Sequence, residues 1–133
     1  MRKLLQPEGW VRPKGYSNGV AASGRMVFTA GVVGWNNDEV FERSDFLGQF
    51  DQTLANTVAI LAEGGAKPED IVRMTAYLTD KAEYLSNLPT VGKIWLDRLG
   101  HVFPAVAFVE VKSLMEDAAL IEIETTAMVP ENA

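Results

Sequence analysis

The strongest constraint in this 133-residue sequence is a change in the spacing of its apolar residues after position 44. From there, large apolar side chains recur every three or four positions, at Phe46, Phe50, Leu54, Val58 and Leu61. This spacing places them on one face of an α-helix. Ser44 stands where it can cap the first turn, and Gly64-Gly65 can end the helix. The segment therefore predicts an amphipathic helix whose apolar face must pack against another apolar surface.

Several other segments have the composition of β-strands, which are rich in β-branched and aromatic residues. These segments are residues 19–22, 26–30, 71–79, 106–111 and 120–128. Ser23-Gly24-Arg25 separates the first two, and glycine at such a place is typical of a hairpin turn. We expect these first two strands to pair with each other.

A second helix is predicted from the high 80s to the end of the 90s. Its apolar face carries Val91, Ile94, Trp95 and Leu99. Proline is tolerated in the first turn of a helix, so Pro89 places the start nearby, with Ser86 or Asn87 as the cap. A start near Lys81 would instead require a kink at Pro89.

The order of these elements is ββαβαββ, which corresponds to an α+β fold with two helices on one face of a mixed sheet. We expect residues 1–133 to form a single domain, because neither a repeat nor a linker interrupts them. Two helices cover only one face of a sheet, and an apolar uncovered face usually marks an interface. We therefore expect an oligomer with Glu122 near a subunit boundary. The alternative is a half-polar face exposed to solvent.

Composition excludes several classes of function. The net charge is −6, whereas nucleic-acid binding requires clustered Lys and Arg, so we expect no nucleic-acid partner. No cysteine and a single histidine, His101, leave neither a disulfide framework nor a zinc or iron site. A magnesium site built from carboxylates stays open as an alternative, because the chain has 18 Asp and Glu residues. No apolar run can span a bilayer, and Leu4-Leu5 is too short for a signal peptide, which favours a cytoplasmic protein without a membrane partner.

Short motifs along the chain point to one family. They are Tyr16-Ser17-Asn18-Gly19-Val20, Met26-Val27-Phe28-Thr29-Ala30-Gly31, Asp70-Ile71-Val72-Arg73-Met74-Thr75, Phe103-Pro104-Ala105 and Ile121-Glu122-Ile123-Glu124. In this order they resemble the motifs of the Rid family (reactive intermediate deaminases, also called the YjgF family). The resemblance covers nearly the whole chain.

This resemblance implies a chorismate-mutase-like (YjgF-like) α+β unit and a homotrimer with ligand clefts between neighbouring subunits. Members of the family hydrolyse imines or enamines to a carbonyl compound and ammonia, without a metal or an organic cofactor. By resemblance, Glu122 orients the attacking water, and Tyr16 and Asn87 line the cleft for a small-molecule substrate. Gly31 lets the backbone approach the ligand.

The chain departs from the family at Val106. Family members have an arginine after Pro-Ala, and this arginine grips the substrate carboxylate through charge-assisted bonds of roughly 1.5–3 kcal/mol each. A carboxylate placed against Val106, Ala107 and Phe108 would instead be an unpaired charge in apolar surroundings. We therefore expect a ligand to present an apolar or aromatic group there.

The turn after the second strand supplies further candidates for contact with the ligand. Within Gly31-Val32-Val33-Gly34, we expect Val32 to border the ligand, and Trp35 follows where it can stack on an aromatic group. The alternative to ligand contact for Trp35 is packing within its loop. For Val106 the alternative is an ordinary position in the core of the strand. The cations that could replace the missing arginine are His101, Arg25, Arg73 and Lys112, and we expect the last three to be surface charges.

Two hypotheses about function follow. The leading one is a cofactor-free hydrolase or deaminase of a small imine, enamine or related electrophile, with altered substrate preference. The other is a trimeric small-molecule-binding protein without turnover, in which Glu122 is an ordinary polar residue of a half-buried strand. Tyr16, Gly31 and Glu122 favour the enzyme, whereas Val106 favours the binding protein. The acidic balance disfavours ribonuclease activity, another label of the family.

Overall fold

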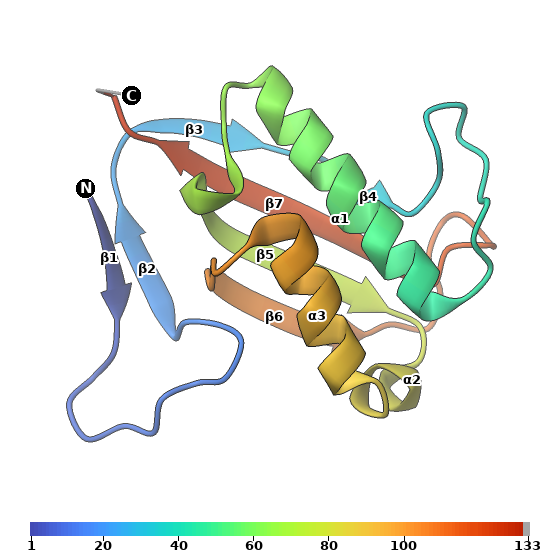
Figure 1. The fold of residues 1–133 in the computed structure, drawn as a ribbon, viewed down its shortest axis with the longest axis horizontal. Coiled ribbons are helices and arrows are strands. Elements are labelled where there is room, and N and C mark those ends of the chain that lie inside the picture. Colours follow the sequence, from blue (N-terminus) through green and yellow to red (C-terminus); the bar gives the residue numbers. More distant parts are fainter. Residues whose placement is uncertain (132–133) are drawn as a thin grey trace.

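Strand β7 (Ile121–Val129) runs through the middle of the main sheet in the computed structural model, which describes residues 1–131 (Figure 1). On one side, β7 pairs antiparallel with β3 (Arg25–Phe28) and β4 (Val32–Val33). On the other side it pairs antiparallel with β5 (Ile71–Leu78). Strand β6 (Ala105–Glu110) pairs in parallel with β5 and forms an edge of the sheet.

The N-terminal strands form a separate two-stranded sheet, in which β1 (Arg2–Leu5) pairs with β2 (Gly19–Ala22) (Figure 1). The predicted hairpin between residues 19–22 and 26–30 is therefore wrong. Gly24 has a φ of +141°, and a Cβ on it would overlap the carbonyl of Val129 at the end of β7. The chain bends here in close contact with β7 and enters the main sheet, so β3 does not fold back on β2.

Helix α1 (Phe46–Glu63) confirms the helix predicted from the apolar spacing, and Gly64 ends it as expected. Its N-cap is Asp45 rather than Ser44, because the Asp45 carboxylate accepts a hydrogen bond from the amide of Gly48 at 2.9 Å. Its fully buried apolar side chains are Phe50, Leu54 and Leu61.

The second predicted helix is preceded by a short separate one. Helix α2 (Lys81–Leu85) and helix α3 (Leu88–Leu99) are distinct, and Pro89 lies in the first turn of α3 as predicted. No kinked helix from Lys81 is formed. Asn87 is the N-cap of α3, but its side-chain amide donates to the Glu83 carbonyl at 2.7 Å. None of the helices within residues 1–131 is long and apolar enough to cross a bilayer.

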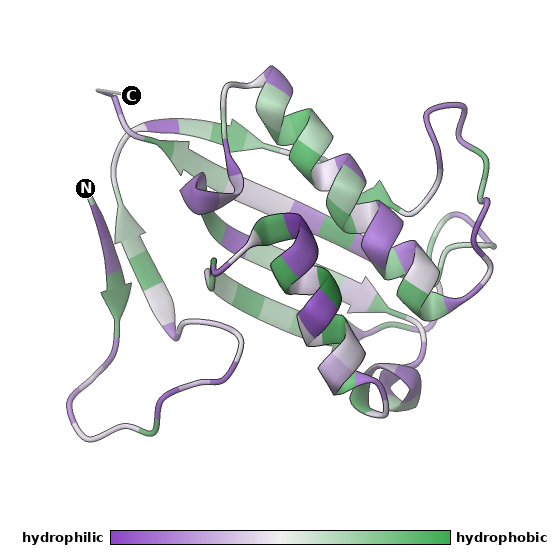
Figure 2. Cartoon of the chain, in the orientation of Figure 1, coloured by the Kyte–Doolittle hydropathy of each residue, from purple (hydrophilic) through white to green (hydrophobic). Residues whose placement is uncertain are grey.

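Helices α1 and α3 cover one face of the main sheet (Figure 1), and α3 shows polar residues alternating with apolar ones along it (Figure 2). A 3-10 helix, η1 (Pro68–Asp70), connects α1 to β5. Trp95 is buried and donates from Nε1 to the Val102 carbonyl at 2.8 Å. Arg98 of α3 donates to both carboxylate oxygens of Asp51 on α1, at 2.7 and 3.1 Å. This arrangement confirms the predicted α+β fold with two helices on one face.

No helix covers the other face of the main sheet within the part of the chain that the structure describes. The strand register places Met26 and Phe28 on this uncovered face, where they are 52% and 62% exposed. The same face carries Tyr77, whose hydroxyl donates to Glu124 at 2.6 Å, and Glu122. The uncovered face is therefore partly apolar and partly acidic.

Gln49 of α1 connects the helix to two loops. Its side chain is only 1% exposed, and its amide nitrogen donates to the carbonyls of Arg43 at 3.1 Å and Ala118 at 2.9 Å. Its carbonyl oxygen accepts the amide of Leu120 at 2.7 Å. The loop that leads into β7 is thereby held against the first turns of α1.

We expect Gln49→Leu to lower the free energy of unfolding by about 2–4 kcal/mol, because buried groups left without partners cost roughly 1–3 kcal/mol each. Urea denaturation followed by circular dichroism measures the change. Gln52→Leu is the control on the same helix, since the side-chain bond of Gln52 among residues 1–131 stays within α1, to Asn56 at 2.8 Å. Loss of this bond should lower the free energy of unfolding by less than about 1 kcal/mol. Equal losses in the two variants would contradict the role given to Gln49.

Candidate functional site

Glu122 lies on the uncovered face near the start of β7, half-buried. The register pairs it with Tyr77 of β5 and Val33 of β4. Gly31, just before β4, lies directly against its carboxylate, because a Cβ on Gly31 would overlap Glu122 Oε2. The structure therefore brings Gly31 and Glu122 together, with no side chain between the carboxylate and the neighbouring backbone.

Helix α1 holds the β4 segment in place beside this carboxylate. Asn56 donates from its side-chain amide to the carbonyls of Val33 at 3.0 Å and Trp35 at 2.7 Å. Val32 is 7% exposed, so its side chain packs in the interior. The ring of Trp35 packs against Phe41, with ring centroids 5.6 Å apart. In this chain Val32 and Trp35 support the turn.

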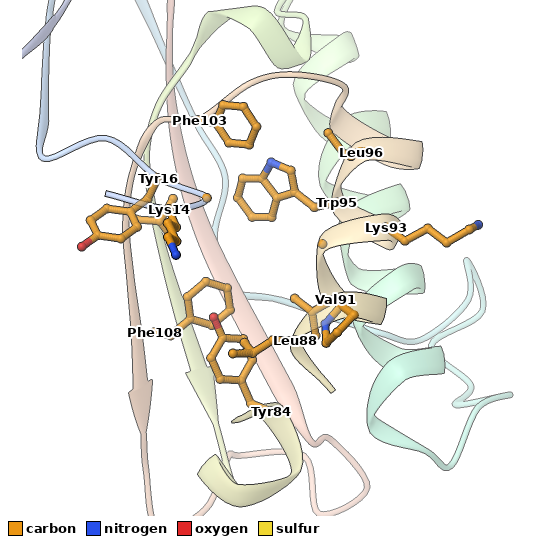
Figure 3. Close-up of a pocket in the computed structure, with 14 residues that line it drawn as sticks. Lys14, Tyr16, Tyr84, Leu88, Val91, Lys93, Trp95, Leu96, Phe103 and Phe108 are labelled. Carbon is orange, nitrogen blue, oxygen red and sulfur yellow. The ribbon is translucent and has the colours of Figure 1, made fainter. Parts of the chain in front are cut away.

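An apolar cavity of about 860 Å³ opens between α3 and the edge strand β6 (Figure 3). Side chains that line it include Tyr16, Val91, Trp95, Phe103, Val106 and Phe108. Tyr84 of α2 also borders the cavity, and its ring stacks on that of Phe108 with centroids 4.5 Å apart. Burial raises the pKa of the Tyr84 hydroxyl above its ordinary value, so this group is uncharged at neutral pH. The cavity is thus an aromatic and aliphatic site.

The loop before β2 forms one wall of this cavity and is anchored to the start of β6. Ser17 is buried, its amide donates to the Pro104 carbonyl at 3.0 Å, and its hydroxyl donates to the Phe103 carbonyl. Gly15 has a φ of +81°, a conformation that glycine adopts readily and that bends the loop. The residues on either side of Gly15 that border the cavity are Lys14 and Tyr16.

The predicted site residues fall on opposite faces of the main sheet. Side chains alternate along a strand, and residues paired across neighbouring strands share a face. Val106 pairs with the buried Met74 on the helix-covered face, whereas Glu122 pairs with Tyr77 on the uncovered face. Ala107, next to Val106, is on the uncovered face. Within one chain, Val106 and Glu122 therefore cannot contact the same small ligand.

The residues that border the cavity differ in part from those predicted. Asn87 precedes the cavity residue Leu88, but its amide is bonded to the Glu83 carbonyl. The cations proposed to replace the arginine lie elsewhere, and the cavity is bordered instead by Lys14 and Lys93. The sequence reasoning missed Lys14 and Tyr84 because no periodic pattern marks their segments, and it missed Lys93 because the apolar spacing of the second helix marked only its buried face. Within residues 1–131, no three His, Asp or Glu side chains are grouped to hold a metal ion.

Comparison with known proteins identifies the family. Residues 11–129 match the sequence model of a family described as Endoribonuclease L-PSP, which is the YjgF/RutC/Rid family. The chain belongs to this family, which confirms the resemblance drawn from its motifs.

Individual relatives cover almost the same length. A RutC family protein from Aquifex aeolicus is 33% identical over 130 residues, which are 96% of this chain and 99% of that protein. The 2-iminobutanoate/2-iminopropanoate deaminase of Escherichia coli is 31% identical over 105 residues, 79% of this chain and 80% of the deaminase. The crystal structure of a Rid-family protein of unknown function from Yersinia pestis has a TM-score of 0.84 and 34% identity, and the match covers 96% and 98% of the two chains. These similarities confirm the predicted YjgF-like fold.

We expect Gly31→Ala to move the Glu122 side chain, because the added methyl group would overlap its carboxylate. A crystal structure of the variant would show Glu122 rotated away from position 31. Gly92→Ala in α3 is the matched control, since nothing lies within 4 Å of a Cβ at that position. This control should leave Glu122 in place and stabilise the helix by about 0.5–1 kcal/mol. An unmoved Glu122 in Gly31→Ala would contradict the close packing described here.

Proposed function

We propose that this protein is a cytoplasmic, cofactor-free hydrolase that converts small imines or enamines into carbonyl compounds and ammonia. The observation that carries the proposal is the Glu122 carboxylate on the uncovered face, packed against the backbone at Gly31. The carboxylate can lie against this backbone because position 31 has no side chain. Membership of the Rid family supports the proposal, as does the Escherichia coli relative named an imine deaminase.

The reaction requires one carboxylate that accepts and returns a proton. A water held by Glu122 adds its oxygen to the carbon of the protonated C=N bond, and its proton passes to Glu122. Glu122 then protonates the nitrogen of the tetrahedral adduct, the C–N bond breaks and ammonia leaves. The remaining hydroxyl loses its proton to ammonia and becomes the carbonyl. An enamine first gains a proton on carbon and then follows the same course, so each turnover consumes one water.

The complete site is proposed to form between copies of the chain in a homotrimer. Val106 and Glu122 face opposite sides of one sheet, so a ligand in the cavity can reach a Glu122 only from a second copy. Exposed Met26 and Phe28 supply apolar area on the uncovered face for such an assembly. In this arrangement, Glu122 and Gly31 of one copy meet the cavity of its neighbour.

Val106 is proposed to alter the substrate preference. A bidentate arginine would contribute roughly 1.5–3 kcal/mol per charge-assisted bond to a carboxylate, and valine contributes none. Its neighbours in the cavity, among them Phe103 and Phe108, favour an apolar group at this place. Small imino acids that depend on the arginine are therefore expected to be poor substrates.

A second candidate function is binding of a small molecule without turnover. The observation that favours it is the same apolar cavity, in which position 106 carries a valine and no charged side chain. The ribonuclease activity named in the family description is less compatible with this chain, whose net charge of −6 opposes binding of phosphate backbones.

Hydrolysis of two imines by the purified protein tests the proposal. One is 2-iminopropanoate, generated from alanine by an amino-acid oxidase. The other has no carboxylate and is generated from phenylethylamine by an amine oxidase. We expect the wild type to accelerate loss of the carboxylate-free imine, followed by absorbance, and Glu122→Gln to lower that rate roughly 100-fold or more. Val106→Arg should gain activity on 2-iminopropanoate.

Glu124→Gln is the control for Glu122→Gln, because Glu124 lies on the same strand and face but is bonded to Tyr77. It should retain most of the activity. Absence of turnover of either imine, by the wild type and by Val106→Arg, would reject the hydrolase and favour the binding protein. Equal losses in the two glutamate variants would reject a specific role for Glu122.

A further inference from the structure

We infer that the cavity between α3 and β6 binds a molecule with an apolar, preferably aromatic, group inside and an anionic group held by Lys14 at the mouth. This inference rests on the proposed function, since it names the substrate class of that site. It starts from the charge around the cavity. Two lysines and no carboxylate border it among the described residues, although the whole chain carries a net charge of −6.

The two lysines at the cavity differ in their surroundings. Lys93 is paired with Asp97 at 3.2 Å, and Figure 3 shows its side chain extending away from the cavity. Lys14 forms no ion pair within residues 1–131. In Figure 3 it lies beside Tyr16, with its nitrogen on the side of Phe108. Lys14 therefore presents an available cation to a ligand, whereas the charge of Lys93 is already compensated.

The position of Lys14 is set by its loop, whose backbone is attached to the segment before β6. Two hydrogen bonds from Ser17 attach the loop to the residues just before β6, and the bend at Gly15 places Lys14 and Tyr16 at the same cavity. The Lys14 ammonium is exposed, so we expect it to attract an anion at the mouth with the modest strength of a surface ion pair. It is also a compact point charge, so it accepts an anion without the planar geometry that an arginine requires.

The size of the cavity agrees with a ligand that places an apolar group inside and an anionic group at the mouth. About 860 Å³ is within the range of small-molecule sites and exceeds what a methyl or ethyl group would fill. The imine of an aromatic amino acid carries an aromatic group, a carboxylate and the C=N carbon within a few bonds of one another. With the ring near Phe108 and Trp95 and the carboxylate at Lys14, the C=N carbon would remain at the mouth. There it would face the Glu122 that a neighbouring copy is proposed to supply.

Direct binding of two unreactive probes tests the inference. The probes are 3-phenylpropanoate and its neutral counterpart 3-phenylpropanamide, titrated into the full-length protein by isothermal calorimetry at low salt. We expect the wild type to bind the carboxylate more tightly than the amide. Lys14→Met keeps the aliphatic stem and removes the charge, so it should weaken binding of the carboxylate about fivefold, which corresponds to ~1 kcal/mol, and leave the amide unaffected.

Lys14→Arg should retain the preference for the carboxylate, and Lys93→Met should bind both probes like the wild type. Equal affinity of the wild type for the two probes, no binding of either, or a parallel loss of both in Lys14→Met would overturn the inference. Neither probe contains a C=N bond, so the result is independent of turnover. Binding that depends on Lys14 without imine hydrolysis would reject only the hydrolase. Hydrolysis without that dependence would reject only the role of Lys14.

Discussion

The alternation of side chains along β7 is the constraint on which the rest of the structure depends. Ile121, Ile123 and Ala127 are buried in the core, as is Thr125, so the residues that alternate with these four must point to the uncovered face. Since β7 pairs with β3, β4 and β5, a shift of its register by one residue would exchange the two faces and disrupt all of these pairings. Glu122 is therefore fixed on the uncovered face by its apolar neighbours in sequence, and Gly31 is the residue that makes room for it.

The cavity lies on the helix-covered side of the same sheet, at the edge that β6 forms. Strand β6 pairs with β5 along its length and forms one further bridge, from Ala105 to Ser17, and the side chains of its helix-covered face are partly buried beside α3. Tyr84 stacks on Phe108 and extends this surface beyond the sheet. Val106 is consistent with its surroundings here, because an arginine at the same place would begin in an apolar wall and need an anion to offset its desolvation. The valine thus belongs to a cavity whose lining is mostly apolar, with the polar groups of two tyrosines and two lysines at its border.

Much of the fold could be predicted because long apolar patterns determine it. The spacing from Phe46 to Leu61 located α1, and Pro89 located the start of α3. The partner of β2 could not be predicted, because residues 19–22 carry no signal that distinguishes pairing with β3 from pairing with β1. Alternation and family motifs pointed to Gly31 and Glu122, which do lie together. The border of the cavity depends on Lys14 and Tyr84, which come from irregular or short segments that tertiary contacts alone bring together.

The separation of the cavity from Glu122 determines how binding and chemistry relate in this chain. Val106 and Lys14 border the cavity, whereas Glu122 lies on the opposite face of the same sheet, so a change at Lys14 or Val106 need not move Glu122. In the proposed assembly the proton-transfer group comes from a different copy. A change in the cavity would then alter which ligand binds while Glu122 stays in place, and a loss of contacts on the uncovered face would stop hydrolysis while the cavity persists. On this argument, the hydrolase and the trimeric binding protein share the same cavity and differ in whether Glu122 of a neighbouring copy acts on its ligand.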